Sequence, residues 1–515
     1  MKVQKDSPFA YEGTSDVDQL TSGPKLARNA LWNIVGHSAP LVVAFFAFPF
    51  LINGLGTDRF GILSLAWMVI GYFSLFDLGL GRALTKLIAE KLGAGDGDTI
   101  PDLAQTGLCL MTALGFLGTF VVVAVSHQLV FNILNVPSFL QVETVHSFYV
   151  LSLSIPFVIA STGLRGILEA YQRFDLANAV RIPLGVITFL GPVLVLPFSD
   201  SLVPVMWVLG CGRLIVCIWS LFLCVRLVPD LLGKAKIQRN LFRPLLSFGG
   251  WMSVSNALGP FLVYIDRFLI GSMIAMAAVA YYVTPYEVAT KLWLVPYAVA
   301  GVLFPAFSTT LVNDKFHAQR LFNRGVNYIF VALFPVVLAI VIFAQQGLGL
   351  WLGAEFAENS TRVLQWISVG VLINSLGHIP FALIQGAGKP DITAKLHLFE
   401  LPIYLLALWL LVDLYGIEGA AIAWVGRVIL DTLLLFFISK RYLPSNVVFI
   451  QQKALSLCVA LLILLIAAGM ENIFFKVVYF SGIILLLIPA VWFLFLTKED
   501  KSFIRNYLKN FPLFN

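Results

Sequence analysis

The chain has 515 residues, of which 59% are hydrophobic and 12% are charged, with a formal net charge of +6. Soluble globular domains carry about 25% charged residues, so this composition excludes a soluble protein. It indicates a polytopic helical membrane protein. The excess of Lys and Arg is concentrated on one side of the predicted membrane. It therefore reflects membrane topology, and we expect no nucleic acid partner.

The first 27 residues are polar and of mixed charge, without an apolar core or a small-residue cleavage pattern, and predict a cytoplasmic tail rather than a signal peptide. Beyond them, apolar segments long enough to cross a bilayer predict about 14 transmembrane helices in an all-α integral membrane fold. The predicted ranges are 28–52, 59–84, 103–127, 144–170, 177–198, 203–226, 244–271, 279–306, 325–344, 361–386, 393–413, 418–439, 454–470 and 477–496.

The predicted helices divide the chain into two lobes of six helices, followed by an extra pair. The expected parts are a tail at 1–27, an N-terminal lobe at 28–228, a cytoplasmic linker at 229–243, a C-terminal lobe at 244–441, two additional helices at 442–496 and a tail at 497–515. Most of the 34 Lys and Arg residues fall on one side of the predicted membrane. By the positive-inside rule, that side and both termini are cytoplasmic.

The connections between predicted helices are short, none longer than about 16 residues. They leave no room for a soluble catalytic or nucleotide-binding domain. The glycine-bearing segment 93–98 lacks the Lys-Ser/Thr pair of a phosphate-binding loop. The six His and five Cys residues show no metal-ligand spacing. We therefore expect no cofactor and no metal site, and we do not expect an enzyme.

An arginine lies in the middle of the apolar segment 206–226, which contains no acidic residue. Arg at the bilayer centre on a lipid-facing helix costs roughly 2.5–3.5 kcal/mol even on insertion scales. Arg213 is therefore expected to face a protein interior or a watery cavity. Arg427 occupies a similar position 214 residues later, preceded by glycine as Arg213 is. Two such arginines suggest a cavity that binds an anion.

An internal repeat relates the two predicted lobes. Residues 29–84 correspond to 246–304, with Trp32 matching Trp251. Because each lobe has an even number of helices, the two lobes share one orientation, as in parallel transporter repeats that hold substrate at their interface. A scaffold or a channel could show the same repetition.

Several segments resemble those of bacterial polysaccharide and O-antigen flippases. The resemblance covers most of the first twelve predicted helices and is carried by the segments FGILSLAWMVIGYFSLFDLGLGRALTKLIAE at 60–90, GILEAYQRFD at 166–175, YIDRFLIG at 264–271, YYVTPYEVATKLWLVPYAVAGVLFPAFS at 281–308 and GAGKPD at 386–391. It implies membership of the multidrug/oligosaccharidyl-lipid/polysaccharide exporter superfamily. The implied location is the bacterial cytoplasmic (inner) membrane.

The resemblance implies export of undecaprenyl-pyrophosphate-linked oligosaccharide from the inner to the outer leaflet, for surface polysaccharide such as lipopolysaccharide or exopolysaccharide. Its partners would be the lipid-linked oligosaccharide, membrane lipids, and a polysaccharide polymerase and glycosyltransferases. A polar cavity with fixed positive charge could carry the pyrophosphate, since arginine donates paired hydrogen bonds to phosphate. The candidate substrate-binding residues are Arg82, Arg213, Arg267, Lys291 and Arg427.

Each candidate except Arg213 has a structural alternative. Arg82 could be an ordinary positive-inside residue. Lys291 lies four residues after Glu287, a spacing that favours an ion pair. Arg427 either neutralises Asp431, one turn later, or faces the cavity.

If transport is coupled to a gradient of H+ or Na+, carboxylates in membrane helices are the candidate ion sites, since they are otherwise costly there. These candidates are Asp77, Asp266 and Glu287. Two other functions stay open within the same superfamily: lipid II export for cell-wall synthesis, and drug/cation antiport. Antiport would favour an acidic cavity, whereas the arginine at 213 points to an anion. A membrane enzyme would be expected to show a long outer loop or a clustered His/Asp motif, which the sequence lacks.

Overall fold

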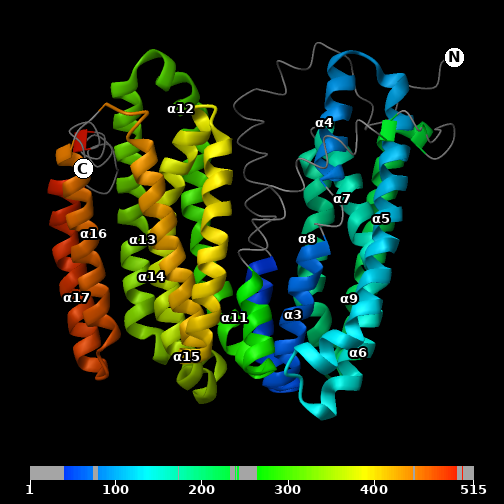
Figure 1. Cartoon of the computed structure of the whole chain (residues 1–515), viewed down its shortest axis with the longest axis horizontal. Coiled ribbons are helices and arrows are strands. Elements are labelled where there is room, and N and C mark those ends of the chain that lie inside the picture. The colour runs from blue at the N-terminus through cyan, green and yellow to red at the C-terminus, as the bar shows by residue number, and fades with distance from the viewer. Residues whose placement is uncertain are drawn as a thin grey trace, which may run out of the picture. The chain divides into compact units, whose positions relative to one another are not determined.

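The computed structural model describes residues 40–73, 79–171, 173–231, 238, 241–242, 264–444, 447–495 and 501–502. Within these residues every regular element is a helix (Figure 1). The described residues form two compact units, the first ending at Ala280 and the second starting at Tyr281. The predicted all-α class is therefore confirmed.

The first unit opens with a helix at Pro40–Leu55 and includes a helix at 264–273. Its other helices are α3 (Thr57–Phe73), α4 (Leu80–Gly93), the short η2 (Gly97–Thr99), α5 (Ile100–Gln128), the π-helical η3 (Leu129–Ile133), α6 (Ser138–Ser152), α7 (Ile155–Ala170), α8 (Phe174–Val195), α9 (Leu202–Leu227) and η4 (Pro229–Leu231). Helix α11 (Met276–Thr290) begins in this unit and continues into the second.

The second unit holds the longest helices of the described chain. The helices of the second unit are η6 (Lys291–Trp293), α12 (Leu294–Asn313), α13 (Lys315–Leu352), α14 (Ala354–Gly386), α15 (Pro390–Ser439), α16 (Val447–Ala468), α17 (Ile473–Ala490) and the π-helical η7 (Val491–Phe495). Helix α14 packs against α13 on one side and against α15 on another.

Nine helical stretches of the described residues are long and apolar enough to cross a membrane. The predicted count of fourteen stays a prediction, partly because α15 merges two predicted spans. The backbone turns within α15 at Gly416, whose φ of 59° is a left-handed value that suits glycine. The predicted spans 393–413 and 418–439 are therefore the two antiparallel arms of α15. Residues 144–170, predicted as one helix, are divided between α6 and α7 by a turn at Leu153 and Ser154.

Residues 264–280 belong to the first unit, although the predicted linker at 229–243 would place them in the C-terminal lobe. Asp58 accepts a hydrogen bond from the backbone of Ala277 (3.2 Å), and Asn135 donates one to the carbonyl of Ser272 (2.8 Å). At Gly61 a side chain would collide with a backbone carbonyl of α11. These local contacts attach the start of α11 to α3 and to the segment after η3. The lobe boundaries drawn from the sequence stay a prediction.

Hydroxyl side chains within the helices bond mostly to their own backbone, which lets polar residues occupy apolar helices. Thr112, Ser126 and Thr144 each donate to the carbonyl four residues earlier, at 2.5–2.7 Å. Without such partners a buried hydroxyl would be costly. Many large apolar side chains, in contrast, project outward, as Phe120 does with 71% of its surface exposed. In a membrane helix such a surface is suited to contact with lipid.

Candidate functional site

Arg213 lies on the buried face of α9, the face on which Leu209, Gly212 and Val216 are also buried. Its side chain is 5% exposed, and its Nη1 donates to the carbonyl of Leu209 at 2.7 Å. No carboxylate among the described residues forms an ion pair with it. The structure thus places Arg213 in the protein interior, as one sequence alternative expected, with a charge that its described neighbours leave uncompensated.

Arg427 has different surroundings. Its guanidinium carbon lies 5.4 Å from the ring centre of Tyr404 on the other arm of α15. The ion pair with Asp431, one of the two alternatives that the sequence leaves open, is not formed among the described side chains. The Asp431 carboxylate lies 3.6 Å from Nε2 of His397 instead. Arg427 and Asp431 therefore occupy one polar region without making the local ion pair that their spacing allows.

The same region contains a residue that the sequence analysis missed. Glu400 is fully buried, with 0% of its surface exposed, and neither of its carboxylate oxygens has a hydrogen-bond partner among the described atoms. The charged groups that act on it are Asp431 and Arg427. A signal was available, because Glu400 interrupts an apolar segment. The sequence alone does not single it out, because only the antiparallel packing of the two arms brings Glu400 opposite Asp431.

The two predicted residues at the start of the 264–273 helix are buried in the first unit. Asp266 is 0% and Arg267 is 3% exposed. An Asp266 oxygen accepts the backbone N–H of Arg267 at 2.7 Å, and the Arg267 guanidinium lies 4.7 Å from the ring centre of Tyr264. Both residues make further polar interactions. These contacts are compatible with a structural role and with a lining role.

The remaining candidates lie nearer the surface or outside the described residues. Lys291 donates to Glu287 at 2.8 Å, so the ion pair that their spacing favours is present. Arg82 is exposed on α4. Asp77 lies outside the described residues, so its expected role as an ion site stays a prediction.

A second cluster of charges joins three helices of the first unit. Arg59 of α3 donates to both oxygens of Glu143 on α6, at 3.1–3.3 Å, and Glu143 accepts the backbone N–H of Leu202 at 2.6 Å. Asp200 lies 3.8 Å from the same guanidinium. A carboxylate that caps α9 and holds an arginine of α3 fixes the helix ends relative to one another, which indicates a structural function.

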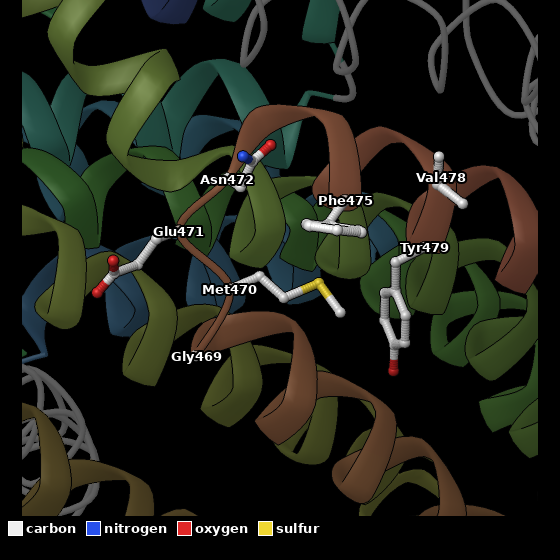
Figure 2. Close-up of a pocket in the computed structure, with 7 residues that line it drawn as sticks. All are labelled: Gly469, Met470, Glu471, Asn472, Phe475, Val478 and Tyr479. Atoms are coloured by element: carbon white, nitrogen blue, oxygen red, sulfur yellow. The ribbon is translucent and has the colours of Figure 1, made fainter.

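The turn between α16 and α17 borders a hollow of about 570 Å³. Residues 469–472 form the turn, and Phe475, Val478 and Tyr479 project from α17 (Figure 2). The hydroxyl of Tyr479 donates to the carbonyl of Ile463 at 3.0 Å, which leaves Glu471 as the ionisable group of the hollow. An apolar chain suits this lining better than a pyrophosphate does.

Comparison with known sequences relates most of the chain to polysaccharide export. It is 31% identical over 417 residues to a "Putative O-antigen transporter" of Shigella flexneri, with 81% of this chain and 98% of the relative covered. It is also 21% identical over 429 residues to a "Probable low-salt glycan biosynthesis flippase" of Haloferax volcanii, with 79% of this chain and 82% of the relative covered.

Comparison with solved structures relates the fold to transporters. An inward-facing multidrug resistance MATE family transporter of the MOP superfamily matches with a TM-score of 0.67 at 16% identity, covering 79% of this chain and 97% of that chain. At this identity the likeness concerns the fold alone, and it agrees with the superfamily that the sequence resembles. The profile described as "Polysaccharide biosynthesis protein" matches residues 26–311. This chain belongs to the polysaccharide biosynthesis protein family of multi-pass membrane proteins.

Proposed function

We propose that this protein moves a lipid-linked oligosaccharide from the inner to the outer leaflet of the bacterial cytoplasmic membrane by alternating access. The observation that carries the proposal is the similarity to the O-antigen transporter over 98% of that relative. The substrate class is an undecaprenyl-pyrophosphate-linked repeat unit. Glycosyltransferases would supply it, and a polysaccharide polymerase would consume it on the outer side.

The physical problem of this transport is the pyrophosphate, because an anion in hydrocarbon is strongly destabilised. Arg213 supports a binding role, since its buried charge lacks a described counter-ion. Arg427, Arg267, Lys291 and Arg82 are further candidate contacts, of which Lys291 is already paired with Glu287. In this proposal Arg213 donates to the pyrophosphate in a state in which the helices covering its guanidinium have moved apart, and Arg427 stays a further candidate contact.

Coupling to an ion gradient would give the transport a direction. Asp266 and Glu287 are the described carboxylates proposed for H+ or Na+, together with Asp77. Asp266 is the better supported of the described pair, because it is fully buried whereas Glu287 is in an ion pair with Lys291. A buried carboxylate changes charge when it binds a cation, which can bias a transporter between two states.

The proposed orientation places both termini in the cytoplasm. Single cysteines at Gln345 and Lys389, in a chain without its five native cysteines, test it. Both positions are exposed. Gln345 lies in the last turns of α13, near the start of α14, and Lys389 follows the other end of α14. An impermeant thiol reagent added to intact cells should label position 345 and leave position 389 unlabelled until the cells are opened. The reverse result would overturn the orientation.

The function itself is tested with purified protein in lipid vesicles. Fluorescent undecaprenyl-pyrophosphate oligosaccharide, lipid II and a cationic dye are offered separately, and the fraction reaching the opposite leaflet or the lumen is measured. Movement of the oligosaccharide lipid well above protein-free vesicles supports the proposal. Preferential movement of lipid II would favour cell-wall synthesis, uptake of the dye would favour antiport, and movement of none of them would refute the proposal.

A further inference from the structure

Glu400 has a buried carboxyl that none of the roles above uses. It lies on the first arm of α15, facing the second arm, and its two oxygens are buried without hydrogen-bond partners among the described atoms. A buried ionised carboxylate without a partner is costly, and the usual response is to bind a proton. The region around Glu400 is therefore a place where a cation should bind.

The charges around Glu400 indicate how many cations are needed. Two carboxylates, Glu400 and Asp431, share the region with one guanidinium, that of Arg427. If both acids are ionised, the two carboxylates and the guanidinium have a net charge of −1 in the region where α14 and α15 pack together. One added proton neutralises the group, and two carboxyls that share a proton are a known arrangement for like charges held close together.

Two histidines border the carboxyl pair from two helices. His397, on the same arm as Glu400, lies 3.6 Å from Asp431, and its side chain is 31% exposed. Asp431 also acts electrostatically on His378 of α14, whose ring meets the ring of Tyr297 edge-on at 4.9 Å. His397 therefore lies between the buried acid and the surface, where an imidazole can receive a proton and pass it on.

A proton fits these residues better than a metal ion. No group of three His, Cys, Asp or Glu side chains in the described part of the chain is placed to hold a metal. The nearby guanidinium of Arg427 repels a metal cation but tolerates a neutral carboxylic acid. A protonated Glu400 can donate to Asp431, which satisfies one of the unpartnered oxygens.

We propose that Glu400 and Asp431 form a proton-binding pair in the second unit, with His397 as the group that connects it to solvent. An O–H bond forms on one Glu400 oxygen with a proton taken from water through His397, and the same proton leaves when the pair ionises again. No electron is transferred. This inference rests on the proposed function and names a coupling site outside Asp77, Asp266 and Glu287.

The test measures protonation directly, on the full chain in lipid nanodiscs without substrate. Infrared difference spectra between acidic and alkaline pH report the carbonyl stretch of a protonated carboxyl. We expect a titrating band in the wild type that is lost in both Glu400→Gln and Asp431→Asn. It should persist in Asp413→Asn and Glu358→Gln, which neutralise exposed acids of α15 and α14. A band unchanged in both pair variants would overturn the proposal.

Two further measurements separate the alternatives. Adding Na+ at fixed pH should leave the band unchanged, and a Na+-dependent loss would show that the site binds the metal ion instead of the proton. His397→Gln should slow the appearance of the band after a pH jump while keeping its final size, whereas an unchanged rate would remove His397 from the proposal. If one pair variant fails to fold, the other still tests the pair.

The outcome is independent of whether the oligosaccharide is the substrate. A titrating pair in a protein that does not move the oligosaccharide lipid would refute the proposed function and keep the proton site. If the protein moves that lipid but its band is unaffected by Glu400→Gln and Asp431→Asn, the proposed function is kept and the proton site is refuted. In vesicles, Glu400→Gln should keep downhill movement and lose its acceleration by a pH gradient.

Discussion

The repeat-related arginines of the two units have different surroundings. Arg213 is buried on α9 with its own backbone carbonyl as its described partner, whereas Arg427 shares its region with Glu400 and Asp431. At the offset of 214 residues that relates the arginines, Glu400 corresponds to Val186 and Asp431 to Cys217. The repeat therefore reproduces the cation and not its counter-charges. Arg213 has no ion-pair partner among the described residues, whereas Arg427 lies near two acids.

The largest effect expected from this difference concerns Arg213. Arg213→Gln should reduce polysaccharide at the cell surface roughly tenfold or more, because a charge-assisted contact to phosphate is lost. The amount of folded protein should stay normal, since no described acid loses a partner. Arg213→Lys should keep part of the activity, because the charge survives without the paired donors. Full export by Arg213→Gln, measured against protein abundance, would end the phosphate-binding role.

Arg427→Gln should act first on stability, unlike the change at Arg213. It leaves Glu400 and Asp431 buried without their nearby positive charge, at a cost of roughly 1–3 kcal/mol. Thermal unfolding in detergent should show a lowered midpoint. Adding Glu400→Gln should restore much of the loss, since it removes one of the two acids.

The matched control for Arg427→Gln is Arg362→Gln, which neutralises an exposed arginine of α14. Its midpoint should stay near that of the wild type. If Arg427→Gln/Glu400→Gln exports less than Glu400→Gln alone while folding is restored, Arg427 also contacts substrate. Equal midpoints for wild type and Arg427→Gln would contradict the difference drawn between the two arginines.

A smaller loss of stability is expected for the ion pair of the first unit, between Arg59 and Glu143. Glu143→Gln weakens the contacts to Arg59 and to the backbone of Leu202, both partly buried, and should cost about 1 kcal/mol. A lowered unfolding midpoint with export normal per folded molecule would identify the cluster as structural. Asp98→Asn, at an exposed position of η2 in the same unit, is the control. A loss of export at a normal midpoint would contradict a purely structural role.

The sequence predicts the class and much of the helix order because hydropathy and segment length depend on local composition. The spans predicted at 393–413 and 418–439 correspond to the two arms of α15, and Gly416 lies in the connection between them. The acid at position 400 was not, because its importance depends on which residue lies opposite it after folding. For the same reason the sequence leaves open whether Arg427 pairs with Asp431. Helical spacing permits that pair, but His397 and Tyr404 on the other arm compete for the partners.

The smallest effect concerns an exposed carboxylate, in contrast to the buried Glu400. Asp314 precedes α13 and accepts the backbone N–H of His317 at 3.0 Å, which lowers the pKa of its carboxyl below the ordinary value, with Arg320 adding to the effect. Because the folded pKa is depressed, the stabilisation is present above the unfolded pKa, about 3.9. It is lost as the pH falls below that value through the folded pKa.

Asp314→Asn keeps an oxygen that can accept the same bond and removes the charge, so the advantage of the wild type over this variant should be constant above about pH 5 and shrink as the pH falls below the unfolded pKa. Asp314→Ala should lower the unfolding midpoint at all these pH values, because it also removes the helix cap. Glu358→Gln, at an exposed position of α14, should show no such pH-dependent difference. If the advantage over Asn instead grew as the pH fell, the carboxylate would have a raised pKa in the folded chain, and the capping interaction would not account for it.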